Sequence, residues 1–87
     1  MKIKSGYVLK EVAGSFIVVS VGERVKEFNG VIVLNETGVF LWKKLERGAT
    51  EEGLVKDLLA EYEVEESVAK SDVAAFIAKM KEAELLK

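Results

Sequence analysis

The 87-residue sequence contains no cysteine and no histidine. Without cysteine the chain has no disulfide framework, no zinc thiolates and no thiol nucleophile. Without histidine it also lacks the imidazole of the usual catalytic pairs and of most metal sites. Only carboxylate, lysine, hydroxyl and phenol groups are left to carry chemistry. We therefore expect a protein that is not an enzyme and that binds no cofactor and no metal.

The chain also has no proline, no internal repeat and no stretch of linker composition, which predicts a single domain over residues 1–87. No segment approaches the roughly 18 continuous apolar residues of a membrane span, and the N-terminal MKIKSGYVLKEV has no apolar core of signal-peptide length. We expect a cytoplasmic protein with no membrane partner. With 49% apolar and 32% charged residues, the composition is that of a globular protein.

Charge is unevenly distributed along the chain. Residues 1–34 carry five basic and three acidic side chains, whereas residues 35–87 carry eight basic and twelve acidic ones. A nucleic-acid-binding domain normally shows a basic surplus on its recognition elements. The distribution therefore argues against a nucleic-acid partner.

The N-terminal part of the sequence favours β-strands. Segments 7–12 and 15–21 are rich in strand-forming residues, and the short connection Ala13-Gly14 predicts a hairpin between them. Asn29-Gly30 favours a type I′ turn that leads into a strand at 31–34. The intervening residues 23–29 are open to two interpretations, a loop or an additional strand, so the antiparallel sheet has three or four strands.

The C-terminal part favours three helices. Asn35 is a strong N-cap and predicts a helix over 36–47, Thr50 caps a second over 51–62, and a third follows over 66–84. Helical spacing predicts that these residues face the core: Leu34, Gly38, Leu41, Trp42, Leu45, Leu54, Val55, Leu58, Leu59, Tyr62, Val68, Ala69, Val73, Phe76, Ile77 and Met80. Leu85 and Leu86 should fold back onto it. The order predicts an α+β fold of the winged helix-turn-helix type.

The segments LNETGVFLWKKL, GATEEGLVKDLLAEYEV and SDVAAFIAKMKEAELL resemble the PqqD-like family. Members of that family are RiPP recognition elements, which hold the leader region of a ribosomally synthesised precursor peptide for a maturation enzyme, often a radical SAM protein. The resemblance implies that the leader peptide joins the N-terminal sheet as an extra strand beside the third strand. It also implies a peptide groove shared with the third helix.

The expected peptide-binding residues follow from this resemblance and from strand chemistry, since a sheet edge offers unpaired N–H and C=O groups. Small alanines on the third helix would let a peptide approach closely, and Lys79 could meet an acidic side chain. The expected site consists of Val31, Ile32, Val33, Leu34, Ser71, Ala75, Ala78, Lys79 and Glu82.

The sequence departs from the family pattern at three helix ends. Glu63 and Glu84 stand where the family commonly has glycine, and Glu65-Glu66 replaces an Asp-Pro that opens the third helix. A residue other than glycine in a left-handed helix cap costs about 1 kcal/mol, so these helix ends should be less well capped. Residues 23–29 are also an addition, and they could cover the binding edge or supply it.

Other hypotheses about contacts and function stay open at this point. Val39 and Phe40 could contact a maturation enzyme or a second copy of the chain in a homodimer. A winged-helix DNA-binding regulator is the main alternative function, although the third helix carries no arginine and has more acidic than basic residues. A purely structural subunit is a third possibility.

Overall fold

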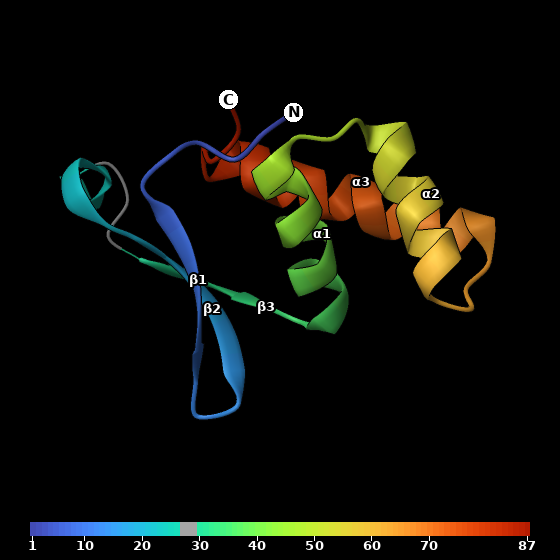
Figure 1. Cartoon of the computed structure of the whole chain (residues 1–87), viewed down its shortest axis with the longest axis horizontal. Helices are drawn as coiled ribbons and strands as arrows, with labels where there is room; N and C mark the ends of the chain where they lie inside the picture. Colours follow the sequence, from blue (N-terminus) through green and yellow to red (C-terminus); the bar gives the residue numbers. More distant parts are fainter. Residues whose placement is uncertain (27–29) are drawn as a thin grey trace.

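The structure is a computed structural model, and it describes residues 1–26 and 30–87. Its elements are β1 (Tyr7–Val12), β2 (Ser15–Ser20), the 3₁₀ helix η1 (Gly22–Lys26), β3 (Val31–Leu34), α1 (Glu36–Arg47), α2 (Glu51–Glu61) and α3 (Glu66–Glu82) (Figure 1). The strands form one antiparallel sheet in the order β1-β2-β3. The predicted α+β class, a sheet followed by three helices, is confirmed.

The β1–β2 hairpin closes through a two-residue turn. Ala13 has φ 51° and Gly14 has φ 82°, and two positive φ values are what a type I′ turn requires. From this turn the two strands pair along their whole length, from Val12 opposite Ser15 to Tyr7 opposite Ser20. The hairpin expected from the sequence is therefore present. The turn expected at Asn29-Gly30 lies outside the described residues, because Asn29 is not among them.

The additional strand considered for residues 23–29 is wrong over its first part. Gly22 has φ 61°, which turns the chain out of β2, and residues Gly22–Lys26 form η1. Arg24 holds this turn in place, since its Nε donates a hydrogen bond to the Ser5 carbonyl at 2.9 Å and its guanidinium lies 5.9 Å from the centre of the Tyr7 ring. Residues 27–29 lie outside the described part of the chain.

Two of the helices begin with the predicted side-chain caps. Asn35 Oδ1 accepts from the Gly38 N–H at 2.8 Å, and Thr50 Oγ1 accepts from the Gly53 N–H at 3.0 Å. At the start of α3, Glu65 makes no side-chain cap. The weaker start expected from Glu65-Glu66 is thus present in the structure.

The C-terminal helix ends differ from one another. Glu84 has φ 60°, so a side chain other than glycine does occupy a left-handed position after α3. The end of α2 is different, because its C-cap Tyr62 is extended at φ −123° and Glu63 is not among the residues with positive φ. The expected strain is therefore confirmed at Glu84 and wrong at Glu63.

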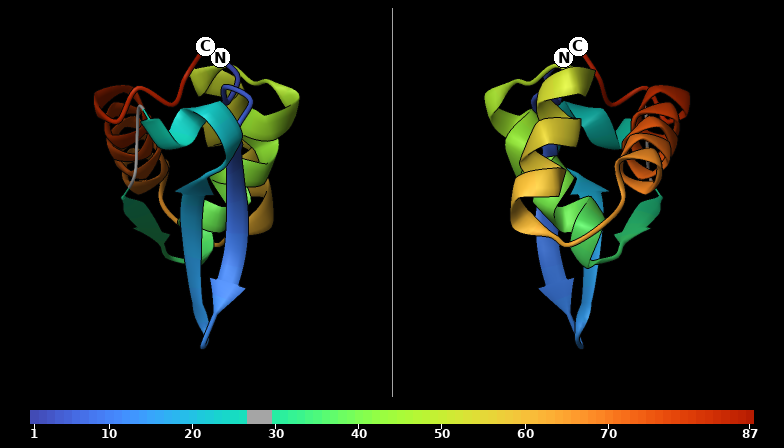
Figure 2. Two further views of the ribbon diagram at one scale, coloured as in Figure 1. Left: turned by 90° about the vertical axis from the view of Figure 1, so that its left-hand side faces the viewer. Right: turned by 90° about the vertical axis from the view of Figure 1, so that its right-hand side faces the viewer.

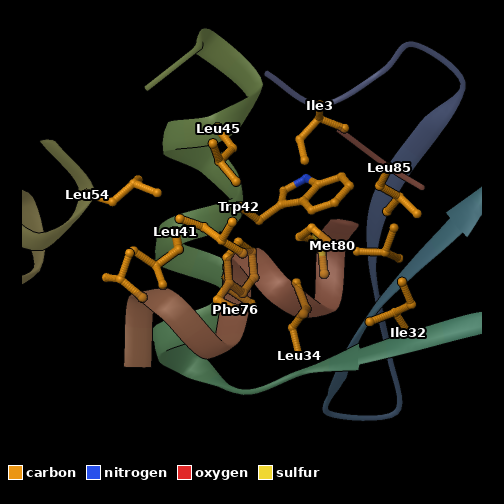
Figure 3. Packing of buried hydrophobic residues seen from close by; sticks show 14 of the residues in the cluster. Ile3, Ile32, Leu34, Leu41, Trp42, Leu45, Leu54, Phe76, Met80 and Leu85 are labelled. Carbon is orange, nitrogen blue, oxygen red and sulfur yellow. The ribbon is translucent and has the colours of Figure 1, made fainter. Parts of the chain in front are cut away.

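The core lies between the inner face of the sheet and the helices, with Trp42 near its centre (Figure 3). Ile32 and Leu34 of β3 point toward Phe76 and Met80 of α3 in this view. Most of the residues predicted to be inward are buried, but Val68 is 45% exposed, and Leu59 and Tyr62 are half-buried. Val68 lies in the first turn of α3 next to Ala69, which is completely buried, so the helix turns the Val68 side chain out of the core.

The two chain ends lie side by side (Figure 2). Ile3 pairs with Leu86 as an antiparallel bridge, and the Lys4 N–H donates to the Leu85 carbonyl at 2.8 Å. Leu85 is completely buried. The expected folding back of the C-terminal leucines is confirmed. Across the described residues, none of the helices combines the length and the apolar character needed to cross a membrane.

Candidate functional site

The strand β3 lies at the edge of the sheet, with β2 on one side only. Its residues alternate strictly between the two faces. Ile32 and Leu34 are buried at 7% and 5% exposure, whereas Val31 and Val33 are 58% and 59% exposed. An apolar edge strand of this kind is a template for pairing with another strand.

One hydrogen bond indicates which main-chain groups of β3 face the open side. Lys79 Nζ of α3 donates to the Val33 carbonyl at 3.4 Å, so this carbonyl points away from β2. In an antiparallel ladder the N–H and C=O of one residue point to the same side, and the side alternates from residue to residue. Val31 and Val33 therefore direct their main-chain groups to the open edge, and Ile32 and Leu34 direct theirs to β2.

A groove of about 270 Å³ lies beside this edge. It is lined from one side by Val33, Leu34, Asn35, Thr37, Gly38 and Leu41, and from α3 by Asp72, Ala75, Phe76 and Lys79. The floor is apolar, because Leu34, Leu41 and Phe76 are buried. The rim is polar and charged, with Asp72 and Lys79 both exposed.

Gly38 lets the first turn of α1 approach the end of β3. A Cβ at this position would lie 3.3 Å from Leu34 Cβ and 3.2 Å from Asn35 Oδ1, the atom that caps the helix. Helical spacing placed Gly38 on the core face of the helix, and its close contact is with Leu34, the last residue of β3. This packing brings strand, cap and helix together at one end of the groove.

The structure separates the expected helix residues into two groups. Ala75 and Lys79 line the groove, whereas Ser71, Ala78 and Glu82 are exposed on α3 and are not among the lining residues. The lining residues that the sequence reasoning missed are Asn35, Thr37, Gly38, Leu41, Asp72 and Phe76. The spacing of Asp72, Ala75 and Lys79, three and four residues apart, places them on one helix face and could have pointed to Asp72.

Val39 and Phe40, the expected partner contact, are not exposed as a patch. Val39 is buried in the core, and Phe40 is half-buried. The Phe40 ring meets the Tyr62 ring edge to face, with centroids 5.6 Å apart, and Lys44 Nζ lies 5.3 Å from its centre. Neither residue lines the groove.

Partial burial raises the pKa of the Tyr62 phenol, and the nearby carboxylates Glu36 and Glu61 raise it further. Tyr62 is thus a neutral packing partner of Phe40 around neutral pH. As for metal ligands, the described residues include no group of three acidic side chains close enough to hold an ion.

Comparison with known protein families gives one assignment. The family model described as "Coenzyme PQQ synthesis protein D (PqqD)" matches residues 6–86. The chain belongs to the PqqD family. The resemblance noted from the sequence is therefore confirmed. Among curated proteins, no relative matches this PqqD-family chain.

Two solved structures share the fold. One is "TbiB1 in Complex with the TbiA(beta) Leader Peptide", with a TM-score of 0.77 and 24% identity, covering 100% of this chain and 95% of the other. The second is "Lasso peptide synthetase B1 complexed with the leader peptide", with a TM-score of 0.73 and 21% identity, covering 97% and 93%. At these identities the likeness establishes the fold of the PqqD-family chain.

Proposed function

We propose that this PqqD-family protein binds the leader region of a ribosomally synthesised precursor peptide as an additional strand on β3. The observation that carries the proposal is the outward-facing main chain of Val31 and Val33 beside the groove. Two proteins of the same fold were captured with leader peptides, which supports the same class of ligand here.

The geometry accounts for a useful affinity. Pairing with Val31 and Val33 offers four main-chain hydrogen bonds, and at about 1 kcal/mol each they would give only millimolar binding. Alternate side chains of an added strand point to opposite faces, so every second one enters the groove. Burying one or two apolar side chains there at roughly 1.5–3 kcal/mol each brings the affinity into the micromolar range.

We further propose that the bound peptide is presented to a maturation enzyme, for which a radical SAM protein is one class. The protein itself would be non-catalytic and would act by holding the peptide extended. The two similar solved structures are both complexes with leader peptides. The DNA-binding alternative therefore gains no support from them.

The proposal is tested by placing proline at the two edges of the sheet. Val33→Pro removes the N–H that faces the strand added by the peptide, and its ring occupies space that this strand needs. The hydrogen bonds between β3 and β2 stay intact. Glu11→Pro is the matched control, because the same alternation directs the Glu11 N–H to the far edge at β1. The probe is a fluorescently labelled leader peptide, selected from short peptides encoded near the gene by its binding to the unmodified protein.

Val33→Pro should weaken binding by at least about tenfold, since the hydrogen bond from the Val33 N–H is lost and the proline ring obstructs the close approach of the added strand. Glu11→Pro should bind as the unmodified protein does. Circular dichroism and the fluorescence of the single Trp42 check that both variants stay folded. Equal binding by the folded Val33→Pro variant would refute strand addition at β3.

A further inference from the structure

We infer that the groove selects the peptide that it binds, called the guest below, by its charge as well as by its shape. The guest would carry a carboxylate beside Lys79 and, about four residues away on the same face of the strand, a basic side chain beside Asp72, with an apolar residue midway between them. The inference rests on the proposed function and adds to it the chemical class of peptide that the site accepts.

Lys79 occupies the place that a guest strand needs. Its ammonium lies 3.4 Å from the Val33 carbonyl, a long hydrogen bond at an exposed position. A guest N–H must replace it at that oxygen. The ammonium then remains at the rim of a groove that the guest has closed to water. A carboxylate on the guest is the natural partner for it, whereas a neutral guest leaves it unpaired.

Asp72 provides the opposite charge at the other end of the same groove. It is exposed, and within residues 1–26 and 30–87 neither Asp72 nor Lys79 has an ion-pair partner. Two surface ion pairs lie elsewhere on the molecule, Glu23 with Lys26 and Glu66 with Lys70. The two groove charges are thus available to a ligand.

The spacing of the two charges sets the spacing in the guest. Lys79 and Asp72 are seven residues apart on α3, which corresponds to about 10 Å along a helix. A strand covers that length in about three residues at roughly 3.3 Å each, and because only every second side chain faces the groove, the matching pair of side chains is about four positions apart. The floor between them is made of Leu34, Leu41 and Phe76, which favours an apolar side chain at the intermediate position.

The order of the charges is fixed as well. The helix α3 runs roughly opposite to β3 in two perpendicular views (Figures 1 and 2). Lys79 therefore lies beside Val33, and Asp72 lies toward the start of α1. A peptide that binds in the same direction with the two charges exchanged would place like charges together at both ends. Such contacts discriminate between guests more strongly than they add affinity.

The test selects binders from a displayed library of random peptides on the folded full chain. Parallel selections use Lys79→Glu, Asp72→Lys and the control Lys81→Glu, whose position is exposed on α3 outside the groove. The unmodified protein and Lys81→Glu should enrich an acidic and a basic residue about four positions apart. Lys79→Glu should enrich a basic residue in place of the acidic one, and Asp72→Lys an acidic residue in place of the basic one.

One enriched peptide is then measured against neutral variants. Lys79→Met should weaken it about five- to tenfold, and Lys81→Met less than about twofold. If the selected peptides lack the charge pair, or if all variants select the same peptides, the inferred charge preference is wrong. The proposed function is unaffected by either result. If Val33→Pro binds every selected peptide as tightly as the unmodified protein does, the proposed function and the inferred charge preference are both wrong.

Discussion

Ala75 and Ala78 are the same residue type on the same helix, but only Ala75 lines the groove. Both were expected to form the site, because small side chains permit close approach of a peptide. Ala78 lies about 60° around the helix from Ala75, on the side opposite to Asp72 and Lys79, and therefore outside the groove. The two alanines look alike in the sequence but have different neighbours in the fold.

Ala75→Met should weaken leader-peptide binding by about tenfold or more, since the longer side chain fills the space that a guest side chain would occupy. Ala78→Met is the matched control and should change the affinity less than about twofold. Alanine and methionine both favour helix, so neither variant should lose much stability. Fluorescence anisotropy of the labelled leader segment measures both. Equal losses at the two positions would show that the groove is not the binding site.

Ala13 holds a backbone conformation that alanine tolerates poorly, with φ 51° in the hairpin turn. Ala13→Asn should raise the free energy of unfolding by roughly 0.5 kcal/mol, because asparagine accepts the left-handed region more readily. Gly14→Ala should lower it by about 1 kcal/mol, since Gly14 has φ 82°. Urea unfolding followed by Trp42 fluorescence measures both changes. A loss of stability in Ala13→Asn would contradict this account of the turn.

The end of α3 shows the same kind of strain at the level of an element. Glu84 has φ 60°, the Leu85 N–H donates to the Met80 carbonyl at 2.9 Å, and Leu85 is buried. These are the features of a Schellman cap, in which glycine normally takes the left-handed position. Glutamate closes the helix here without that advantage.

Glu84→Gly should raise the free energy of unfolding by about 0.5–1 kcal/mol, because relief of strain exceeds the greater entropy of glycine in the unfolded chain. Lys81→Gly is the control inside the helix and should lower it by about 1 kcal/mol. Thermal and urea unfolding of the two variants give the values. If Glu84→Gly is the less stable protein, the left-handed cap does not limit stability.

The elements that the sequence predicts well are those with local causes. Asn35 and Thr50 mark helix starts because each side chain caps an amide three residues ahead. The 3₁₀ helix η1 was missed, since its position depends on Arg24 reaching back to the Ser5 carbonyl, a contact between distant parts of the chain. Val68 was assigned to the core although its neighbour Ala69 is the buried residue of that turn, because helical periodicity does not fix how wide the buried stripe of α3 is.

For the molecule as a whole, peptide binding and folding should be coupled, because the edge of β3 and the groove exist only in the folded state. A leader peptide at a hundred times its Kd should raise the free energy of unfolding by about 2.7 kcal/mol. For a domain of this size that corresponds to an increase in Tm of roughly 10–20 °C.

Differential scanning calorimetry at several peptide concentrations tests this coupling, with Val33→Pro as the variant that should show a clearly smaller increase. A similar rise in Tm for Val33→Pro would place the ligand elsewhere on the molecule. An unchanged Tm for the unmodified protein, at peptide concentrations that saturate the fluorescence signal, would indicate binding to the unfolded chain as well.

The sequence by itself determined the strands and helices, the apolar stripe through Trp42 and the family, because periodicity, caps and motif spacing are local properties of the chain. Only the tertiary structure decided which residues form the site. The exposed edge of β3, the groove against α3 and the placing of Lys79 over the Val33 carbonyl join residues 46 positions apart. Such proximity depends on how the helices pack on the sheet, and no local pattern encodes that distance.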